Sequence, residues 1–168
     1  MFDVKAVLTG TPGTGKTTVS ERMSEEGFNI VHLTRFLKRE GLGEEKEERE
    51  VEIPEMVKAL KQKDFQGKTL IEGHLSHHFS ADVCIVLRCR PEKLEERLSE
   101  RDYSEEKVKE NVEAEALDLI LSEAVDIQEK VVEVDTTGKT VEETVEEIES
   151  LVEEGEESYG KVDWTDFL

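Results

Sequence analysis

The chain has 168 residues, which suits one domain with a core of its own. It carries 22 Lys and Arg against 42 Asp and Glu, so the formal net charge is −20, which argues against general affinity for nucleic acid phosphates. The same acidity suits either a basic protein partner or simple solvation of helix faces, and composition does not separate these two readings.

Export and membrane insertion are also disfavoured. An apolar strand begins at residue 4 and leaves no room for a leader, and no apolar run approaches the roughly 20 residues of a membrane span. Cys84 and Cys89 lie around an apolar strand, so buried thiols are expected rather than a disulfide. These features predict a cytoplasmic protein without membrane contacts.

The first elements carry the strongest motif. An apolar strand over 4–9 leads into Gly10-Thr-Pro-Gly-Thr-Gly-Lys-Thr17, which is GxxxxGK[ST] in full, and a helix over 17–26 follows. Glycines let backbone N–H groups turn toward an anion, Lys16 can reach terminal phosphates, and the Thr17 hydroxyl can ligate Mg²⁺. Strand, loop and helix in this order would place phosphates at a helix N-terminus. The alternative interpretation of these residues is a glycine-rich turn without a ligand. The motif predicts nucleoside triphosphate binding.

Strands and helices continue to alternate along the chain. The next elements are a strand over 28–33, a helix over 34–40, a charged run over 44–50 expected to be a solvated loop or frayed helix, a helix over 53–60 and a strand over 69–73. The last are a strand over 83–87, a helix from Pro91, a long helix from the N-cap Ser104 to about Val125, a strand over 131–135 and a helix opened by the Thr140 and Glu143 capping box.

This alternation predicts an α/β fold, a doubly wound parallel sheet of five strands, over one domain spanning 1–168. Residues 34–66 are long enough to form a substrate-binding flap. The acidic tail over 155–168 ends with Trp164 and Phe167, which either anchor a partner or dock back onto the sheet.

Three stretches resemble the adenylate kinase isoenzyme 6 family, a compact branch of the nucleoside monophosphate kinases. The first is Leu8-Thr-Gly-Thr-Pro-Gly-Thr-Gly-Lys-Thr-Thr18, and the last is Val134-Asp-Thr-Thr-Gly-Lys139. Between them, residues at the spacing of the family's lid are Arg97, Leu98, Arg101, Tyr103, Lys107, Asn111 and Glu115. The resemblance extends to about residue 152 and implies a P-loop kinase fold with a lid over 100–110.

Glu72 and His74 follow the third strand, where an acidic residue that orients Mg²⁺ or its waters is expected. The resembling family has an aspartate at the position of Glu72 and a histidine two residues later. The longer Glu72 side chain favours contact with Mg²⁺ through water, and its alternative is a solvent-facing carboxylate. By resemblance, His74 positions the attacking water or acceptor. His77 and His78 are interpreted as surface histidines, because no second group of zinc ligands follows at a metal-site spacing.

Basic residues complete the predicted nucleotide site. Arg97 and Arg101 lie four apart on one expected helix face, where they either clamp the transferred phosphoryl group or pair with neighbouring glutamates. The resemblance favours Arg101, and it places the loop carrying Lys139 beside adenine. The predicted nucleotide-binding residues are Gly13, Thr14, Gly15, Lys16, Thr17, Thr18, Arg101 and Lys139, with Lys16, Glu72, His74 and Arg101 as catalytic residues and Thr17 and Glu72 at Mg²⁺.

The acceptor side departs from the family pattern. Arg35 stands about where the family has an aspartate, Lys38 or Arg39 takes the place of its arginine, and the acidic pair that follows is replaced near Ile53-Pro54. AMP, water and another hydroxyl therefore all stay open as acceptors.

The sequence thus predicts an ATP-binding phosphotransferase or ATPase that uses Mg²⁺. The resemblance implies ATP + AMP ⇌ 2 ADP, and ATP hydrolysis during small ribosomal subunit maturation with a ribosomal protein as partner. One alternative is a kinase for another small acceptor. Another is a nucleotide-gated chaperone of a basic ribosomal protein.

Overall fold

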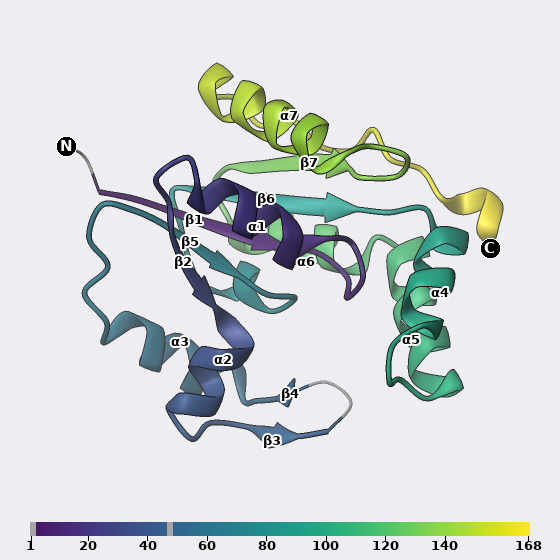
Figure 1. Ribbon diagram of the computed structural model, residues 1–168, viewed down its shortest axis with the longest axis horizontal. Helices are drawn as coiled ribbons and strands as arrows, with labels where there is room; N and C mark the ends of the chain where they lie inside the picture. Colours follow the sequence, from purple (N-terminus) through teal and green to yellow (C-terminus); the bar gives the residue numbers. More distant parts are fainter. Residues whose placement is uncertain (1–2, 47–48) are drawn as a thin grey trace.

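A parallel five-stranded sheet in the order β2-β5-β1-β6-β7 runs through the protein. In the computed structural model, which describes residues 3–46 and 49–168, helices cover both faces of this sheet (Figure 1). Its strands are β1 (Val4–Thr9), β2 (Asn29–His32), β5 (Lys68–Glu72), β6 (Val83–Arg88) and β7 (Val131–Asp135). The predicted doubly wound fold is confirmed.

The helices divide between the two faces and one end of the sheet. One face carries α1 (Lys16–Ser24) and α7 (Val141–Glu154), and the other carries α2 (Leu33–Arg39), α3 (Ile53–Lys61), the 3₁₀ turn η1 (Ser76–His78) and α6 (Leu119–Ile127). The α4 (Pro91–Ser99) and α5 (Glu105–Ala116) pair lies beyond the end of β6 (Figure 1). No described helix is both long and apolar enough to span a membrane.

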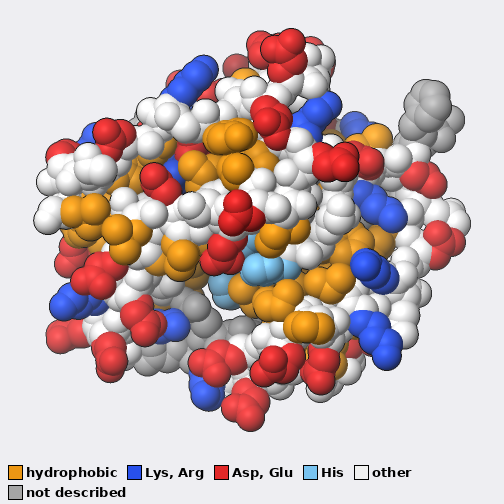
Figure 2. All heavy atoms as spheres, turned by 180° about the vertical axis from the view of Figure 1, so that it is seen from behind, with side chains coloured by type: hydrophobic (Ala, Val, Ile, Leu, Met, Phe, Trp, Pro, Cys, Tyr) orange, Lys and Arg blue, Asp and Glu red, His pale blue; other side chains and the backbone are white. Residues whose placement is uncertain are grey.

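Acidic side chains are scattered over the face of the molecule that Figure 2 shows, and hydrophobic side chains lie exposed between them. The exposed large hydrophobic residues include Leu117, Leu119 and Ile127, at 62%, 50% and 40% exposure. Leu117 directly follows α5, and Leu119 and Ile127 are the first and last residues of α6. The protein surface therefore combines negative charge with exposed apolar side chains.

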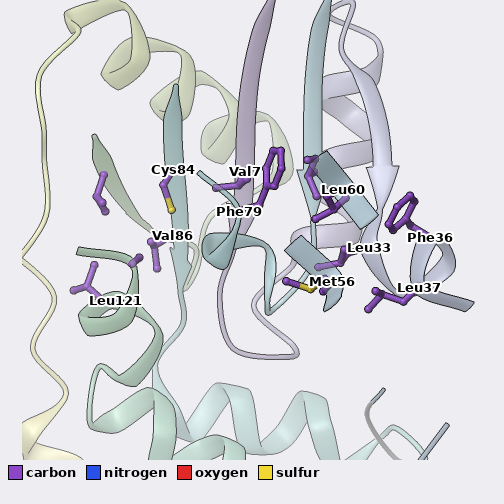
Figure 3. Packing of buried hydrophobic residues seen from close by; sticks show 13 residues of the cluster. Val7, Leu33, Phe36, Leu37, Met56, Leu60, Phe79, Cys84, Val86 and Leu121 are labelled. Carbon is purple, nitrogen blue, oxygen red and sulfur yellow. The ribbon is translucent and has the colours of Figure 1, made fainter. Parts of the chain in front are cut away.

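Alternation along the central strand builds two cores. In β1, Ala6 and Leu8 pack under α1 and α7, while Val7 packs on the opposite face. Figure 3 shows this second core, in which Met56 of α3 and Leu37 of α2 meet the sheet. Both faces of the strands are covered, as is usual in parallel sheets.

Two predicted segments differ from the structure. The charged run over 44–50 was expected to be a loop or frayed helix, but β3 (Glu44–Glu45) pairs antiparallel with β4 (Arg49–Glu50). Residues 47 and 48 of that run, like residues 1 and 2, lie outside the described residues. The predicted long helix after Ser104 is wrong, because α5 ends at Ala116 and α6 begins at Leu119.

Arg88 explains the break between α5 and α6. Its Nη2 donates to the backbone carbonyl of Glu115 at 3.0 Å and to the carboxylate of Asp118, which has a left-handed backbone with φ 56°. In a continuous helix that carbonyl would accept from the amide four residues later. Here the carbonyl accepts from the Asp118 amide at 3.1 Å and from the arginine, and α5 ends at Ala116.

Arg88 also holds a buried ion network at the end of β6. Its side chain is 1% exposed, and it donates to Glu115 Oε2 at 2.9 Å and to Glu133 Oε2 at 2.7 Å. Burial raises the pKa of Glu115, and the Arg88 charge opposes this shift. The arginine thereby compensates carboxylates that would otherwise be costly to bury.

The tail docks back onto the protein, so one of the two alternatives for Trp164 is settled. The backbone of Ser158 pairs with the edge strand β7 through Val131 and Glu133. Trp164 is 5% exposed, lies with its ring 4.8 Å from the Arg90 guanidinium, and donates from Nε1 to Glu115 at 3.3 Å. Its indole is therefore part of the fold.

We expect Arg88→Ala to lower the free energy of unfolding by about 3–5 kcal/mol, because it leaves buried carboxylates without a counter-charge. Urea denaturation at pH 7 measures the loss. The matched control is Arg22→Ala, which removes an arginine that pairs with Glu26 and Glu142 at the surface, where ion pairs contribute little. Equal unfolding midpoints for the two variants would contradict a structural role for the buried network.

Candidate active site

The glycine-rich loop joins β1 to α1 with the backbone that a phosphate-binding loop requires. Gly15, the residue before α1, has φ 104°, and Gly13 has φ 92°. A Cβ on Gly13 would also lie 2.8 Å from Leu94, so α4 leaves no room for a side chain there. Within the loop, the hydroxyl of the buried Thr14 donates to the Thr11 carbonyl at 2.8 Å. The loop is thus braced before any phosphate contact.

Lys16 lies against this loop. Its ammonium donates to the carbonyls of Gly10 at 2.8 Å and Thr11 at 3.1 Å, and the residue is only 8% exposed. Thr17 and Thr18, the next two residues of α1, are exposed. The first turn of the helix therefore presents one cation and two hydroxyls at its positive end, which favours an anion.

A cavity of about 250 Å³ adjoins the loop, and all four predicted catalytic residues line it. Glu72, at the end of β5, and His74 face into it together with Arg101 and Tyr103 from the segment after α4. The complete lining is Pro12, Gly13, Gly15, Lys16, Thr17, Thr18, Thr34, Glu72, Gly73, His74, Arg101 and Tyr103. Parallel strands that end at one edge of the sheet bring these distant residues together.

Glu72 is held by a residue that the sequence analysis missed. His32 ends β2 in register with Glu72, and its Nδ1 lies 2.9 Å from Glu72 Oε2. Glu72 is 8% exposed, so it is not the solvent-facing carboxylate of the alternative reading. A polar residue ending the second strand beside an acidic residue ending the third could have signalled this pair.

His74 is a neutral imidazole at pH 7. Burial, and then the positive charge of Lys16, lower its pKa to about 3. A neutral ring can accept a hydrogen bond at one nitrogen and donate one at the other, whereas both nitrogens of an imidazolium are donors. The site therefore holds a polar group that adds no charge beside Lys16.

A second cavity of about 490 Å³ lies on the other side of the loop. Arg101 lines both cavities, although it follows the end of α4 and does not share a helix face with Arg97 as expected. Arg97 donates to the Gly13 carbonyl at 3.0 Å, which ties α4 to the loop. Lys139 lines this cavity beside Val141, and its ammonium lies 2.6 Å from Glu147.

Other features that the sequence analysis singled out lie outside these two cavities. A larger cavity of about 630 Å³, between α4, α5 and Phe167, contains none of the predicted site residues. Glu115, named for its match to the family's lid spacing, is buried on α5, and its carboxylate accepts from the Thr11 hydroxyl of the loop at 2.8 Å. The interpretation of His77 as a surface histidine is wrong, because it is 1% exposed beneath α6, and His78 is only partly exposed. Glu123 of α6 lies beside both rings as a third potential ligand, which the sequence spacing did not reveal.

Comparisons with known proteins agree with this geometry. A family model described as "AAA domain" matches residues 7–118. Proteins from Thermococcus gammatolerans (50% identity, 95% of this chain and 92% of the relative) and Pyrococcus furiosus (51% identity, 94% and 89%) both bear the description "Putative adenylate kinase".

Solved structures support the fold alone. Deoxyadenosine kinase from M. mycoides with bound dATP is 17% identical, with a TM-score of 0.57 over 89% of this chain and 99% of its own. Shikimate kinase from Aquifex aeolicus is 18% identical, with a TM-score of 0.56 over 90% and 97%. At identities this low, the TM-scores show a shared fold and nothing about activity. With the archaeal relatives at about half identity over nearly the whole chain, the protein belongs to their adenylate kinase-like family of P-loop phosphotransferases.

Proposed function

We propose that the protein is an adenylate kinase that transfers the terminal phosphoryl group of ATP to AMP, with ATP hydrolysis as its side reaction. The observation that carries this proposal is the cavity of about 250 Å³ in which Lys16 and Thr17 of the loop meet Glu72, His74 and Arg101. Phosphoryl transfer needs positioning and charge compensation more than covalent participation, and these groups supply both.

Each group has a distinct role in the proposed site. Lys16 compensates charge on the β- and γ-phosphates, and loop amides around Gly13 and Gly15 hold the phosphate oxygens. Arg101 lines both cavities, so it can contact donor and acceptor phosphates at once. His74, neutral at pH 7, orients the acceptor phosphate of AMP or a water.

The same cavity suits Mg²⁺. Thr17 offers an exposed hydroxyl, and Glu72 offers the carboxylate oxygen that His32 does not hold. Oxygen ligands of this kind, with several waters retained, are what Mg²⁺ prefers. Mg²⁺ would neutralise charge on the phosphates, and we place Thr17 in direct contact and Glu72 behind a bound water.

The acceptor would enter from the segment over 34–66, which we propose as the flap, while the segment over 100–110 with Arg101 and Tyr103 forms the lid. Thr34 lines the cavity, and the exposed Arg35, Lys38 and Arg39 follow it on α2. These cations suit the phosphate of AMP, and they would equally suit another phosphorylated acceptor. A small acceptor with a hydroxyl group is therefore the alternative substrate.

Because the activity depends on ATP, we also place the protein in the cytoplasm.

A coupled assay of ATP turnover, with and without AMP, tests the proposal through Lys16→Ala. We expect AMP to stimulate turnover in the native protein and Lys16→Ala to reduce kcat by about 10²–10³-fold, because one preorganised phosphate contact contributes roughly 3–4 kcal/mol. The matched control is Lys93→Ala, which removes a surface lysine that pairs with Glu96 on α4. Turnover that ignores AMP would favour the ATPase, and native kcat in a folded Lys16→Ala protein would contradict the site.

Glu72→Gln and His74→Gln test the roles beyond triphosphate binding. Both changes keep the side-chain volume, and we expect each to lower kcat by about 10- to 100-fold with little change in the Kd of ATP. Rapid-quench turnover and nucleotide titration measure the two quantities. Glu149→Gln on the exposed face of α7 is the control for the lost charge. If kcat stays native in both variants, neither residue acts in the transition state.

We propose as a second function that the protein binds a basic ribosomal protein of the small subunit and releases it with its ATP cycle. The net charge of −20 and the exposed Leu117, Leu119 and Ile127 favour this partner. Acidic surface steers a cationic protein, and apolar side chains provide anchors. Trp164 is buried in the fold, so the anchors are placed on α6 and at Leu117 just before it.

Binding of a purified basic small-subunit ribosomal protein should weaken between about 0.05 M and 0.5 M salt, because salt screens exposed charges. Affinity should also differ between ATP and ADP. Leu119→Asp should weaken binding more than Val152→Asp, a control at an exposed residue of α7. Equal affinity in all these conditions, together with strong AMP phosphorylation, would leave adenylate kinase activity as the sole function.

A further inference from the structure

Three potential metal ligands converge outside the phosphate-binding cavities. Nε2 of His77 lies 3.1 Å and Nε2 of His78 lies 3.3 Å from the same carboxylate oxygen, Oε2 of Glu123. All three ligand atoms lie within 4.8 Å of one another. We propose that His77, His78 and Glu123 form a binding site for one divalent transition metal of the zinc type, distinct from Mg²⁺ at the P-loop.

The distances between the ligand atoms suit such an ion. Zinc binds imidazole nitrogen and carboxylate oxygen at about 2.0–2.2 Å in a tetrahedron, so neighbouring ligand atoms lie about 3.3–3.5 Å apart. The two nitrogen-to-oxygen distances, 3.1 and 3.3 Å, are close to that edge. The ring centroids of His77 and His78 lie 4.3 Å apart with an angle of 36° between the rings, so both imidazoles approach the same carboxylate.

The chemistry of the donors selects the class of metal. Two imidazoles and one carboxylate suit zinc, cobalt, nickel or copper, whereas Mg²⁺ prefers oxygen ligands and retained waters. Three protein ligands leave a fourth position for water. The site is therefore open on one side, with His78 at 18% and Glu123 at 37% side-chain exposure and His77 at 1%. Histidine side chains reach the surface on the face that Figure 2 shows, beside acidic ones.

The buried histidine is held in place before any ion arrives. Nδ1 of His77 lies 2.7 Å from the hydroxyl of Thr9, the last residue of β1. Gln128 donates to the backbone carbonyls of His77 at 2.7 Å and Phe79 at 2.8 Å, which fixes the η1 turn. Ligating histidines are commonly oriented by a hydrogen bond at the second ring nitrogen, and Thr9 provides that contact.

An ion here would connect η1 to α6 across the face of the sheet. η1 begins two residues after His74, and Thr9 directly precedes Gly10 of the loop. The ion would thus stabilise the segment between β5 and η1, which carries His74, without contacting the phosphates. The role of the ion is structural. Without it, the two rings donate hydrogen bonds to the Glu123 carboxylate.

Calorimetric titration of Zn²⁺ into untagged, nucleotide-free protein in Mg²⁺-free buffer tests the site, together with the visible spectrum of added Co²⁺. We expect one equivalent to bind at micromolar concentration or below, a rise in Tm with Zn²⁺, and intense Co²⁺ bands of a tetrahedral site. Absence of binding at these concentrations would overturn the proposal and leave a hydrogen-bonded cluster.

Variants locate the ion. His78→Ala and Glu123→Gln, both at partly exposed residues, should weaken Zn²⁺ binding at least about tenfold and abolish the Co²⁺ bands. Glu129→Gln is the matched control, an exposed glutamate just after α6 that lies outside the cluster, and it should bind as the native protein does. Native affinity in both ligand variants would place the ion elsewhere, for example at His32 and Glu72, and would overturn the assignment. Because no nucleotide is present, this outcome is independent of the kinase activity.

Discussion

The buried carboxylate of Glu115 is the contact on which the site's architecture depends. It accepts hydrogen bonds from the Thr11 hydroxyl, the Arg88 guanidinium, the Cys89 backbone amide and the Trp164 indole. A carboxylate that is 3% exposed is tolerated only because Arg88 compensates its charge and donors satisfy its oxygens. One ion pair therefore joins the phosphate-binding loop, the end of β6, α5 and the tail.

The parallel sheet then brings the candidate catalytic side chains to that loop. In parallel strands with matched ends, residues that terminate neighbouring strands lie side by side, and this places His32 against Glu72. The loop follows β1, which pairs with β5, so Lys16 and Glu72 reach one cavity although they lie far apart in sequence. Open α/β sheets bind ligands at this carboxyl edge for the same reason.

Local patterns predicted much of the protein, and tertiary contacts account for the rest. The strand at Val4, the glycine loop and the Thr140 capping box depend on neighbours a few residues away, so the sequence alone indicated them. The break after Ala116 depends on Arg88, from a separate strand, and no helical periodicity contains that information. Likewise, Glu123 reaches His77 only once α6 packs on the sheet, since the two residues are 46 positions apart.

The charge distribution reconciles an acidic protein with a highly anionic substrate. Four cations, Lys16, Arg97, Arg101 and Lys139, line the two cavities beside the loop, within a chain whose net charge is −20. At physiological ionic strength, exposed charges further than about 8 Å from a phosphate are largely screened, whereas cations in direct contact with it are not. A small triphosphate therefore experiences mainly the local positive field. A long nucleic acid must also lie across the acidic surface around the cavities, so the same arrangement favours free nucleotides over polymers.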